Sequence, residues 1–290
     1  MPVMTPEIPI ESFEIFATGL DHPECLAFDR DGFLWAGGEA GQIYRIDPTG
    51  KVNTIATMGG FCAGLAFSPE DELFVCNASL GIVRVKASGE FSVFASHAGE
   101  RKLACPNYGV FDSAGNYYVT DSGTNWKSNN GYLLQFTPDG QGRVLSGPHA
   151  YPNGLALSVD EKFLFMVESS TDRVFRFEIG RDGTVGPAEI YAEQAGRFPD
   201  GLALDAEGNL YVSSYASDDI HRVSPSREMT LFAHDRNGFL LGSPTNMAFG
   251  GENLDMMYVA NLARTTITRA RVNRRGQPLV NQRKGRHAKA

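Results

Sequence analysis

Six copies of one short phrase recur along the chain, and this repeat constrains the fold more than any other feature of the sequence. Each copy holds a residue that is often aromatic, usually a proline, a variable residue and then a short apolar run. The copies are HPECLAF at 22–28, FCAGLAF at 61–67, CPNYGVF at 105–111, YPNGLAL at 151–157, FPDGLAL at 198–204 and SPTNMAF at 243–249. Their first residues are 39 to 47 positions apart, a period typical of propellers and solenoids.

The residues after each copy predict three further strands. A turn is followed by a strand such as 34–36, a second turn, an alternating strand such as 42–47 and a fourth short strand such as 92–94. Aromatic and β-branched runs broken by Gly, Asp and Pro are typical of strands. No stretch has a helical period of apolar residues. The sequence therefore predicts an all-β fold, a six-bladed β-propeller with four-stranded blades.

The two ends of the chain complete this prediction. The last repeat supplies only three strands, ending near Val272, and an extra strand at 13–16 precedes the first copy. We expect this N-terminal strand to close the last blade. Residues 1–272 are then a single propeller domain and residues 273–290 a C-terminal tail, whose basic run at 283–287 is expected to be solvated.

The third residue of each copy is predicted to lie at the mouth of the central channel, because the first strand of each blade lines that channel. These residues are Glu24, Ala63, Asn107, Asn153, Asp200 and Thr245. Carboxylates brought close together repel and are costly to bury, and a cation relieves both costs. Oxygen ligands favour Ca²⁺ first, with Zn²⁺, Mn²⁺ and Mg²⁺ as alternatives. For a single copy, an Asn or Asp that caps its own turn is the competing interpretation.

Two further features are predicted to lie near this mouth. Trp126, in the loop 123–131, is expected to cover the pocket or to pack on a neighbouring blade. Asp121 ends the second strand of the blade that carries Asn107. It is either a general base or the cap of the turn that follows.

With these motifs in place, the chain resembles the SMP-30/gluconolactonase/LRE family of six-bladed, metal-dependent lactonases, and more distantly the paraoxonases and the diisopropylfluorophosphatase. The resemblance covers about residues 12–272 and rests on His22-Pro23-Glu24, Pro106-Asn107 and the phrases at 151–158 and 198–205. It implies that Glu24, Asn153 and Asp200 bind one catalytic divalent metal ion and that Asn107 contacts metal, substrate or both. It also implies an acidic general base at Asp121.

One departure from this family bears on the substrate. Its sugar lactonases usually carry Arg-x-Asn-Asp, whereas Cys105 and Tyr108 stand at the Arg and Asp positions here. The resemblance therefore supports a hydrolase of a lactone or ester with an apolar part more strongly than one of a sugar lactone. The residues expected to contact this substrate are Asn107, Tyr108, Phe61, Tyr151, Phe198, Trp126 and His22.

The function predicted from the sequence is metal-dependent hydrolysis of a lactone or related ester, in which the cation polarises the carbonyl group. Asp121, His22 or a metal-bound hydroxide would act as the base. One alternative is another reaction at the same site, such as phosphotriester hydrolysis or a lyase step. The other is a non-catalytic propeller that binds a partner.

Composition limits the partners and the compartment. The net charge of -8 argues against nucleic-acid binding, and no segment has the apolar length of a membrane span. The first residues lack the pattern of a secretory signal, and the four cysteines form no CxxC pair. We therefore expect free thiols, a cytoplasmic location, a small-molecule substrate, and a monomer or small homo-oligomer.

Overall fold

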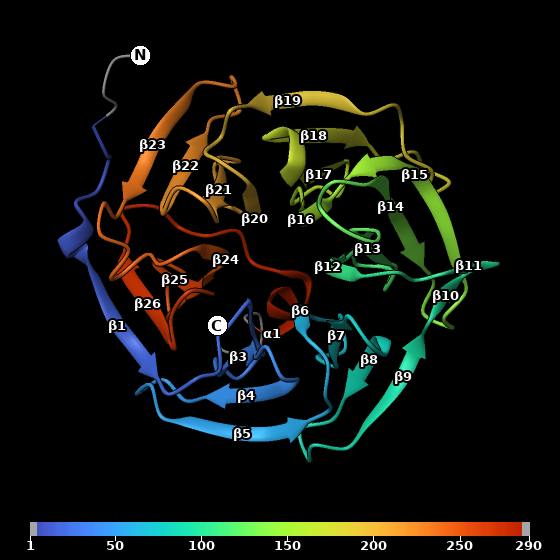
Figure 1. Cartoon of the computed structure of the whole chain (residues 1–290), viewed down its shortest axis with the longest axis horizontal. Coiled ribbons are helices and arrows are strands. Elements are labelled where there is room, and N and C mark those ends of the chain that lie inside the picture. The colour runs from blue at the N-terminus through green and yellow to red at the C-terminus, as the bar shows by residue number, and fades with distance from the viewer. Residues whose placement is uncertain (1–4, 286–290) are drawn as a thin grey trace.

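The structure, a computed structural model, describes residues 5–285 as a ring of six blades around a central channel (Figure 1). Each blade is a four-stranded antiparallel sheet, which confirms the predicted architecture. From the channel outward, the first three blades are β2 (Cys25–Phe28), β3 (Leu34–Gly37), β4 (Gln42–Ile46) and β5 (Val52–Thr57); β6 (Cys62–Phe67), β7 (Leu73–Asn77), β8 (Gly81–Val85) and β9 (Phe91–Ala95); and β12 (Pro106–Phe111), β13 (Tyr117–Asp121), β14 (Asn129–Phe136) and β15 (Gly142–Ala150).

The other three blades follow the same order, and the last is closed by the N-terminal strand. They are β16 (Pro152–Leu157), β17 (Phe163–Glu168), β18 (Arg173–Glu178) and β19 (Glu189–Glu193); β20 (Pro199–Leu204), β21 (Leu210–Ser214), β22 (Asp219–Val223) and β23 (Met229–His234); and β24 (Pro244–Gly250), β25 (Met256–Asn261), β26 (Thr266–Arg271) and β1 (Phe13–Thr18). Antiparallel pairing of β1 with β26 confirms the predicted closure.

Short elements fill the connections. A hairpin of β10 (His97–Ala98) and β11 (Arg101–Lys102) joins the second and third blades. The 3₁₀ turns η1 (Ile10–Ser12) and η2 (Ser169–Thr171) lie before β1 and after β17, and α1 (Val280–Gly285) lies near the C-terminus.

The repeated phrase has a packing reason as well as a chemical one. Its glycines sit where an inner strand touches the next blade. A Cβ on Gly64, Gly154 or Gly201 would lie 2.2, 2.4 or 2.2 Å from a backbone oxygen of the adjacent inner strand. No side chain fits at that distance, so these positions need glycine. The apolar residues that follow pack between blades, as Phe28 of the first blade does edge-to-face with Tyr258 of the last.

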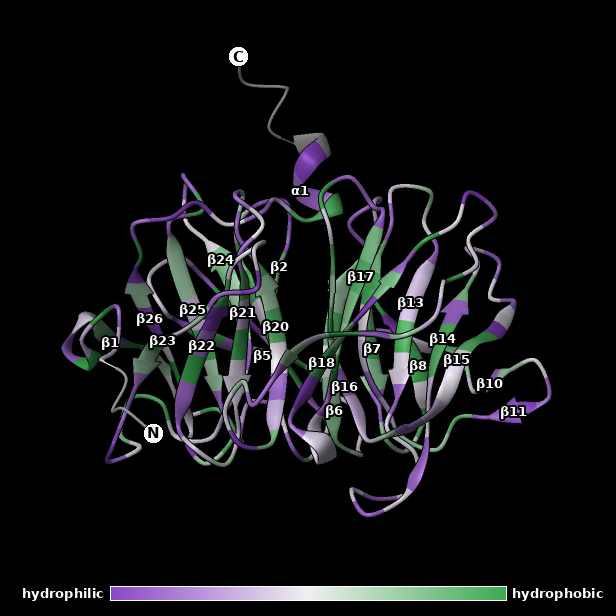
Figure 2. Ribbon diagram, turned by 90° about the horizontal axis from the view of Figure 1, so that it is seen from above, coloured by the Kyte–Doolittle hydropathy of each residue, from purple (hydrophilic) through white to green (hydrophobic). Residues whose placement is uncertain are grey.

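The C-terminal segment departs from the solvated tail that the sequence predicted. Residues 273–285, which we call the C-terminal strap, cross one end of the channel, and Figure 2 shows α1 on that face of the ring. Gln277 Nε2 donates to the Leu157 carbonyl at 2.8 Å, and Asn281 Nδ2 donates to the Phe28 carbonyl at 2.9 Å. Val280 is buried among apolar residues of the second and third blades.

Part of the basic run at 283–287 is also engaged in the structure. Arg283 Nη1 lies 2.8 Å from Glu161 Oε1, so this guanidinium is paired rather than solvated. Arg286 and His287 lie outside the described residues.

Within residues 5–285, no helix is long and apolar enough to cross a membrane. All four cysteines are unpaired, as expected: Cys25, Cys62 and Cys76 are buried and Cys105 is half-buried.

Candidate active site

The polar residues of the repeated phrase come together at the channel end opposite the strap, which we call the mouth. Glu24 directly precedes β2, and Asn107, Asn153 and Asp200 are the second residues of β12, β16 and β20. Each of the four is no more than 7% exposed. The sequence therefore placed its candidate ligands at equivalent positions of four blades.

Three of the four candidate ligands lie at an irregularity in the pairing of their inner strand. The pairing register shifts between Pro106 and Gly109 in the third blade. It shifts in the same way between Pro152 and Leu155, and between Pro199 and Leu202. A bulge re-aims the side chain at which it occurs and ends regular pairing. In these three blades the candidate ligand lies at the irregular start of the inner strand, whereas Glu24 precedes β2, whose pairing with β3 is regular.

The two carboxyl groups at the mouth influence each other. Burial raises the pKa of Glu24 well above its usual range, and the neighbouring Asp200 charge raises it further. Burial raises the pKa of Asp200 to about 8, against the lowering effect of the Asn153 amide. Without a cation nearby, this pair resists carrying two negative charges at neutral pH.

Two oxygens at the mouth lack any hydrogen-bond partner among the described residues. They are Glu24 Oε2 and Asn107 Oδ1, and both are buried. A buried acceptor left unsatisfied costs about 1–3 kcal/mol. Asn153 Nδ2 donates to Ser169 Oγ at 3.3 Å, which fixes the orientation of that amide. Buried oxygen donors with two carboxylates among them fit a hard divalent cation.

Asp121 is held by the backbone. Its Oδ2 accepts the Ala104 N–H at 2.8 Å, and its Oδ1 accepts the N–H groups of Cys105 and Gly123 at 2.8 and 3.1 Å. Both oxygens are therefore engaged, and the residue is 1% exposed. The role of general base stays a prediction, and these bonds are what the turn-capping alternative requires.

Other blades use the equivalent residue in the same way. Asn77 Oδ1 accepts the N–H groups of Ser79 and Leu80, and Asn261 Oδ1 accepts the N–H of Gly242. Glu168 Oε2 accepts the N–H of Ala150. Residues at this position of several blades thus brace the loop beside the mouth by accepting its backbone N–H groups, and Asp121 does the same.

The aromatic residues predicted for the mouth are brought together only in part. Tyr151 and Trp126 line each of two hollows, of about 880 and 550 Å³, and Phe198 lines the smaller one. Cys105 lines the larger hollow, and burial raises its pKa to about 11, which keeps the thiol protonated.

Three predicted substrate contacts lie elsewhere. Phe61 is half-buried and lines neither hollow. His22 Nδ1 lies 3.0 Å from Asp21 Oδ1 and 3.3 Å from Glu39 Oε2, in a partly exposed cluster. Tyr108 stands where three other blades have glycine, and it lines the apolar part of the channel. Burial raises its pKa to about 12.

Two residues near the mouth were not predicted from the sequence. Tyr215 lines the smaller hollow, and Asp172 Oδ1 accepts the Phe198 N–H at 2.7 Å. Tyr215 directly follows the second strand of its blade, one position beyond the set that was compared across repeats. Extending that comparison by one residue would have found it.

The sequence of this chain matches a known protein family and several of its members. Residues 22–263 match the SMP-30/Gluconolactonase/LRE-like region. The chain is 28% identical over 262 residues to 6-deoxy-6-sulfogluconolactonase of Pseudomonas putida, covering 85% of this chain and 81% of that protein. It is 31% identical over 247 residues to lactonase drp35 of Staphylococcus saprophyticus, covering 78% of this chain and 74% of that protein.

A solved structure shows the same fold. Regucalcin from Agrobacterium tumefaciens, a calcium-binding protein, superposes with a TM-score of 0.78 at 17% identity, covering 94% of this chain and 98% of that one. The six blades, the phrase that repeats in them and the match over most of the chain lead to one conclusion: this protein belongs to the SMP-30/gluconolactonase/LRE-like family.

Proposed function

We propose that this protein is a metal-dependent hydrolase of a lactone or related carboxylic ester. The observation that carries the proposal is the mouth itself, where Glu24 Oε2, close to the carboxyl group of Asp200, and Asn107 Oδ1 are both buried without a hydrogen-bond partner among the described residues. Two relatives named as lactonases share between a quarter and a third of the sequence, which supports the same reaction class.

Glu24, Asn153 and Asp200 would hold the cation, with Asn107 on it or directly beside it. When bound, a divalent ion polarises a carbonyl oxygen and stabilises the negative charge that develops there during hydrolysis. Calcium is our first choice because all four donors are oxygens. The calcium-binding regucalcin has the same fold, which is consistent with that choice.

The residues of this chain orient and enclose the reacting group. Ser169 fixes the Asn153 amide, and Asp121 holds the backbone of the segment that leads into Asn107. Tyr151 and Trp126 wall the mouth on the side of the two hollows and would limit the access of water to a bound substrate. We propose Asp121 as a residue that positions Asn107, with its part in proton transfer to be decided by mutation.

A panel of lactones, carboxylic esters and one phosphotriester, each assayed before and after chelation, tests this function. We expect turnover of lactones that is lost on chelation and recovered when a divalent ion is returned. Full activity in protein shown by elemental analysis to be metal-free would contradict the metal-dependent mechanism. Turnover of the phosphotriester alone would favour the alternative reaction, and turnover of nothing would favour a binding module.

A further inference from the structure

A group of four aromatic side chains lies beside the candidate metal ligands. Trp126, Tyr151, Phe198 and Tyr215 line the hollow of about 550 Å³, and we call them the aromatic shelf. Phe198 is the central member. Its ring centroid lies 6.5 Å from that of Trp126, 5.8 Å from that of Tyr151 and 6.2 Å from that of Tyr215.

The shelf is continuous with the metal-binding residues. Tyr151 lies two residues before Asn153, and Phe198 lies two residues before Asp200. Ser169 also lines the hollow, and its Oγ accepts a hydrogen bond from Asn153 Nδ2 at 3.3 Å, so the hollow reaches a side chain in contact with a candidate ligand. A molecule whose carbonyl group reached the cation would therefore place its substituent on the shelf.

The backbone holds these rings in a conformation that would otherwise be disfavoured. Tyr151 and Phe198 have φ angles of 60° and 53°, in the left-handed region that L-residues with bulky side chains avoid. Asp172 accepts the N–H of Phe198, and Ser170 Oγ donates to the Trp126 carbonyl at 2.5 Å. His22 and Ser243, the first residues of two other copies of the phrase, share this conformation, so it is a property of the repeat that fixes where the first side chain of each copy starts.

The exposed area of the shelf remains large despite these supports. Trp126 is 56% exposed and Tyr215 is 39% exposed. Large aromatic surfaces gathered in one hollow are typical of a binding site. The charged side chains that line the hollow are Asp172, which is engaged by Phe198, and Arg197, which is exposed. Ser169 and Ser170 also line the hollow, but both hydroxyl groups are hydrogen-bonded to backbone carbonyls, so the rings and the exposed Arg197 are what the hollow offers to a ligand.

We propose that the aromatic shelf binds a planar aryl substituent of the lactone substrate, so that the preferred substrates are aryl-substituted lactones rather than polyhydroxylated ones. This inference rests on the proposed function and names its substrate class. Rings gain from edge-to-face and offset contacts with an aryl group beyond what burial of apolar area supplies. The polyol of a sugar lactone would find no guanidinium at Cys105, and its hydroxyl groups would face aromatic surface.

Three lactones that share one ring and differ in one substituent test the proposal. They are γ-phenyl-, γ-cyclohexyl- and γ-methyl-γ-butyrolactone, assayed with the metal-loaded full chain. We expect kcat/KM for the phenyl compound to exceed that for the cyclohexyl compound by about tenfold, the size of a few aromatic contacts. Equal values for phenyl and cyclohexyl would show a merely apolar hollow and would overturn the proposal.

Variants of the shelf test whether its rings cause the preference for the phenyl compound. Trp126→Ala and Phe198→Leu should each lower the phenyl-to-cyclohexyl ratio by about three- to tenfold, whereas Trp126→Phe should retain most of it. Phe239→Ala is the matched control, because Phe239 is an aromatic residue that is 69% exposed and does not line the shelf. A ratio that Trp126→Ala leaves unchanged would contradict the assignment.

Fluorescence separates failure of this inference from failure of the proposed function. The chain has two tryptophans, of which Trp35 is buried and Trp126 exposed. If no lactone is hydrolysed, saturable quenching by the phenyl compound that disappears in Trp126→Phe would still support an aryl site while overturning the reaction. Absence of quenching and of phenyl preference would overturn the aryl site alone.

Discussion

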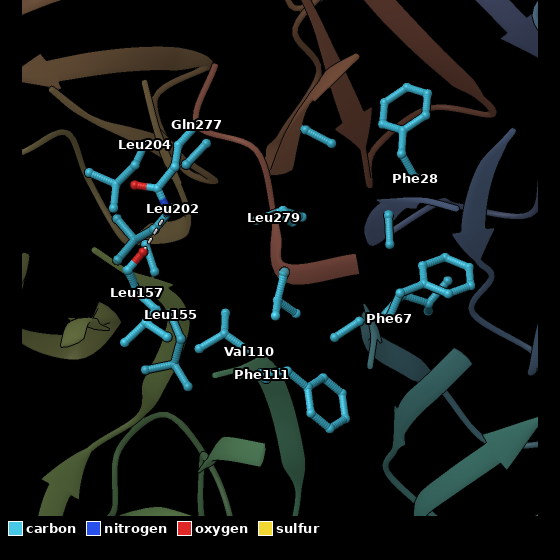
Figure 3. Close-up of a pocket in the computed structure, with 18 of the residues that line it drawn as sticks. Phe28, Phe67, Val110, Phe111, Leu155, Leu157, Leu202, Leu204, Gln277 and Leu279 are labelled. Atoms are coloured by element: carbon cyan, nitrogen blue, oxygen red, sulfur yellow. Dashed lines mark hydrogen bonds between the residues drawn. The ribbon is translucent and has the colours of Figure 1, made fainter. Parts of the chain in front are cut away.

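The two ends of the channel are formed by the same six strands and yet have opposite chemistry. At the mouth, Glu24, Asn107, Asn153 and Asp200 bring buried carboxylates and amides together. At the far end, leucine and phenylalanine side chains surround a cavity of about 90 Å³ beneath the strap, as Figure 3 shows. One residue position per blade, at or just before the start of the inner strand, produces this difference.

The far end shows how such a channel is closed when no ligand is involved. Leu155, Leu157, Leu202 and Leu204 face the cavity, and Gln277 satisfies the Leu157 carbonyl from the strap. The Gln277 and Asn281 amide nitrogens are paired there, although Asn281 Oδ1 is buried without a partner among the described residues, and no carboxyl group lines the cavity. The mouth instead brings together two buried carboxyl groups whose pKa values are raised. That contrast is the physical reason to assign a binding role to the mouth and a structural role to the far end.

The largest effect, on metal affinity and lactone turnover, is expected from substitutions at the mouth. Glu24→Gln and Asp200→Asn each remove a negative charge from the candidate cation site, so each should lower metal affinity and lactone turnover by at least about 100-fold, since even residues that only support a metal ligand contribute 10- to 100-fold. Metal content by elemental analysis and kcat/KM measure this. Gln277→Leu, at the far end, is the control and should leave both quantities near wild type.

Removal of the strap should give the next largest effect, on stability alone. A chain that ends at Asn273 loses the buried Val280 and the hydrogen bonds of Gln277 and Asn281. A loss of roughly 3–5 kcal/mol would lower Tm by about 10 °C in a chain of this size. Lactone turnover below the new Tm should persist. An unchanged Tm would show that the strap does not stabilise the ring.

The smallest effect on stability is expected from Asp121→Asn, because its oxygens brace a single loop. The new amide N–H₂ would oppose a backbone N–H, so Tm should fall by a few degrees and turnover of the folded variant should stay within about tenfold of wild type. Thermal unfolding and kcat measured on the same sample decide this. Turnover reduced by about 10²- to 10⁴-fold at unchanged Tm would instead restore Asp121 as the general base.

The blades and the positions of the candidate ligands were predictable because the repeat keeps its register. Each copy of the phrase places the same backbone in the same surroundings, so Asn153 and Asp200 could be compared directly with Glu24 and Asn107. The N-terminal closing strand was predictable by the same comparison, because one blade lacked a strand.

Features that occur once could not be predicted in this way. The strap has no period, and its contacts to Leu157 and Phe28 depend on where the finished ring leaves a gap. Tyr108 stands where three other copies have glycine, so those copies could not indicate that its side chain lines the apolar part of the channel. For Asp121 the sequence allowed a base or a cap, and only the three backbone N–H groups around it favour the cap.

Calorimetric titration of Ca²⁺ into the metal-free protein at pH 6 and pH 9 tests the central claim most directly. Because the pKa of Asp200 is raised to about 8 and that of Glu24 is also raised, calcium must displace protons at pH 6 and far fewer at pH 9. The metal-free fold should correspondingly lose stability as pH rises through about 8, since the folded carboxyl groups then ionise beside each other.

The predicted result is one site per chain, tighter at pH 9 than at pH 6, with release of protons near neutral pH and strongly weakened binding in Glu24→Gln. Absence of binding by Ca²⁺, Zn²⁺, Mn²⁺ and Mg²⁺ at both pH values, or equal affinity in wild type and Glu24→Gln, would contradict the assignment of the mouth as a metal centre.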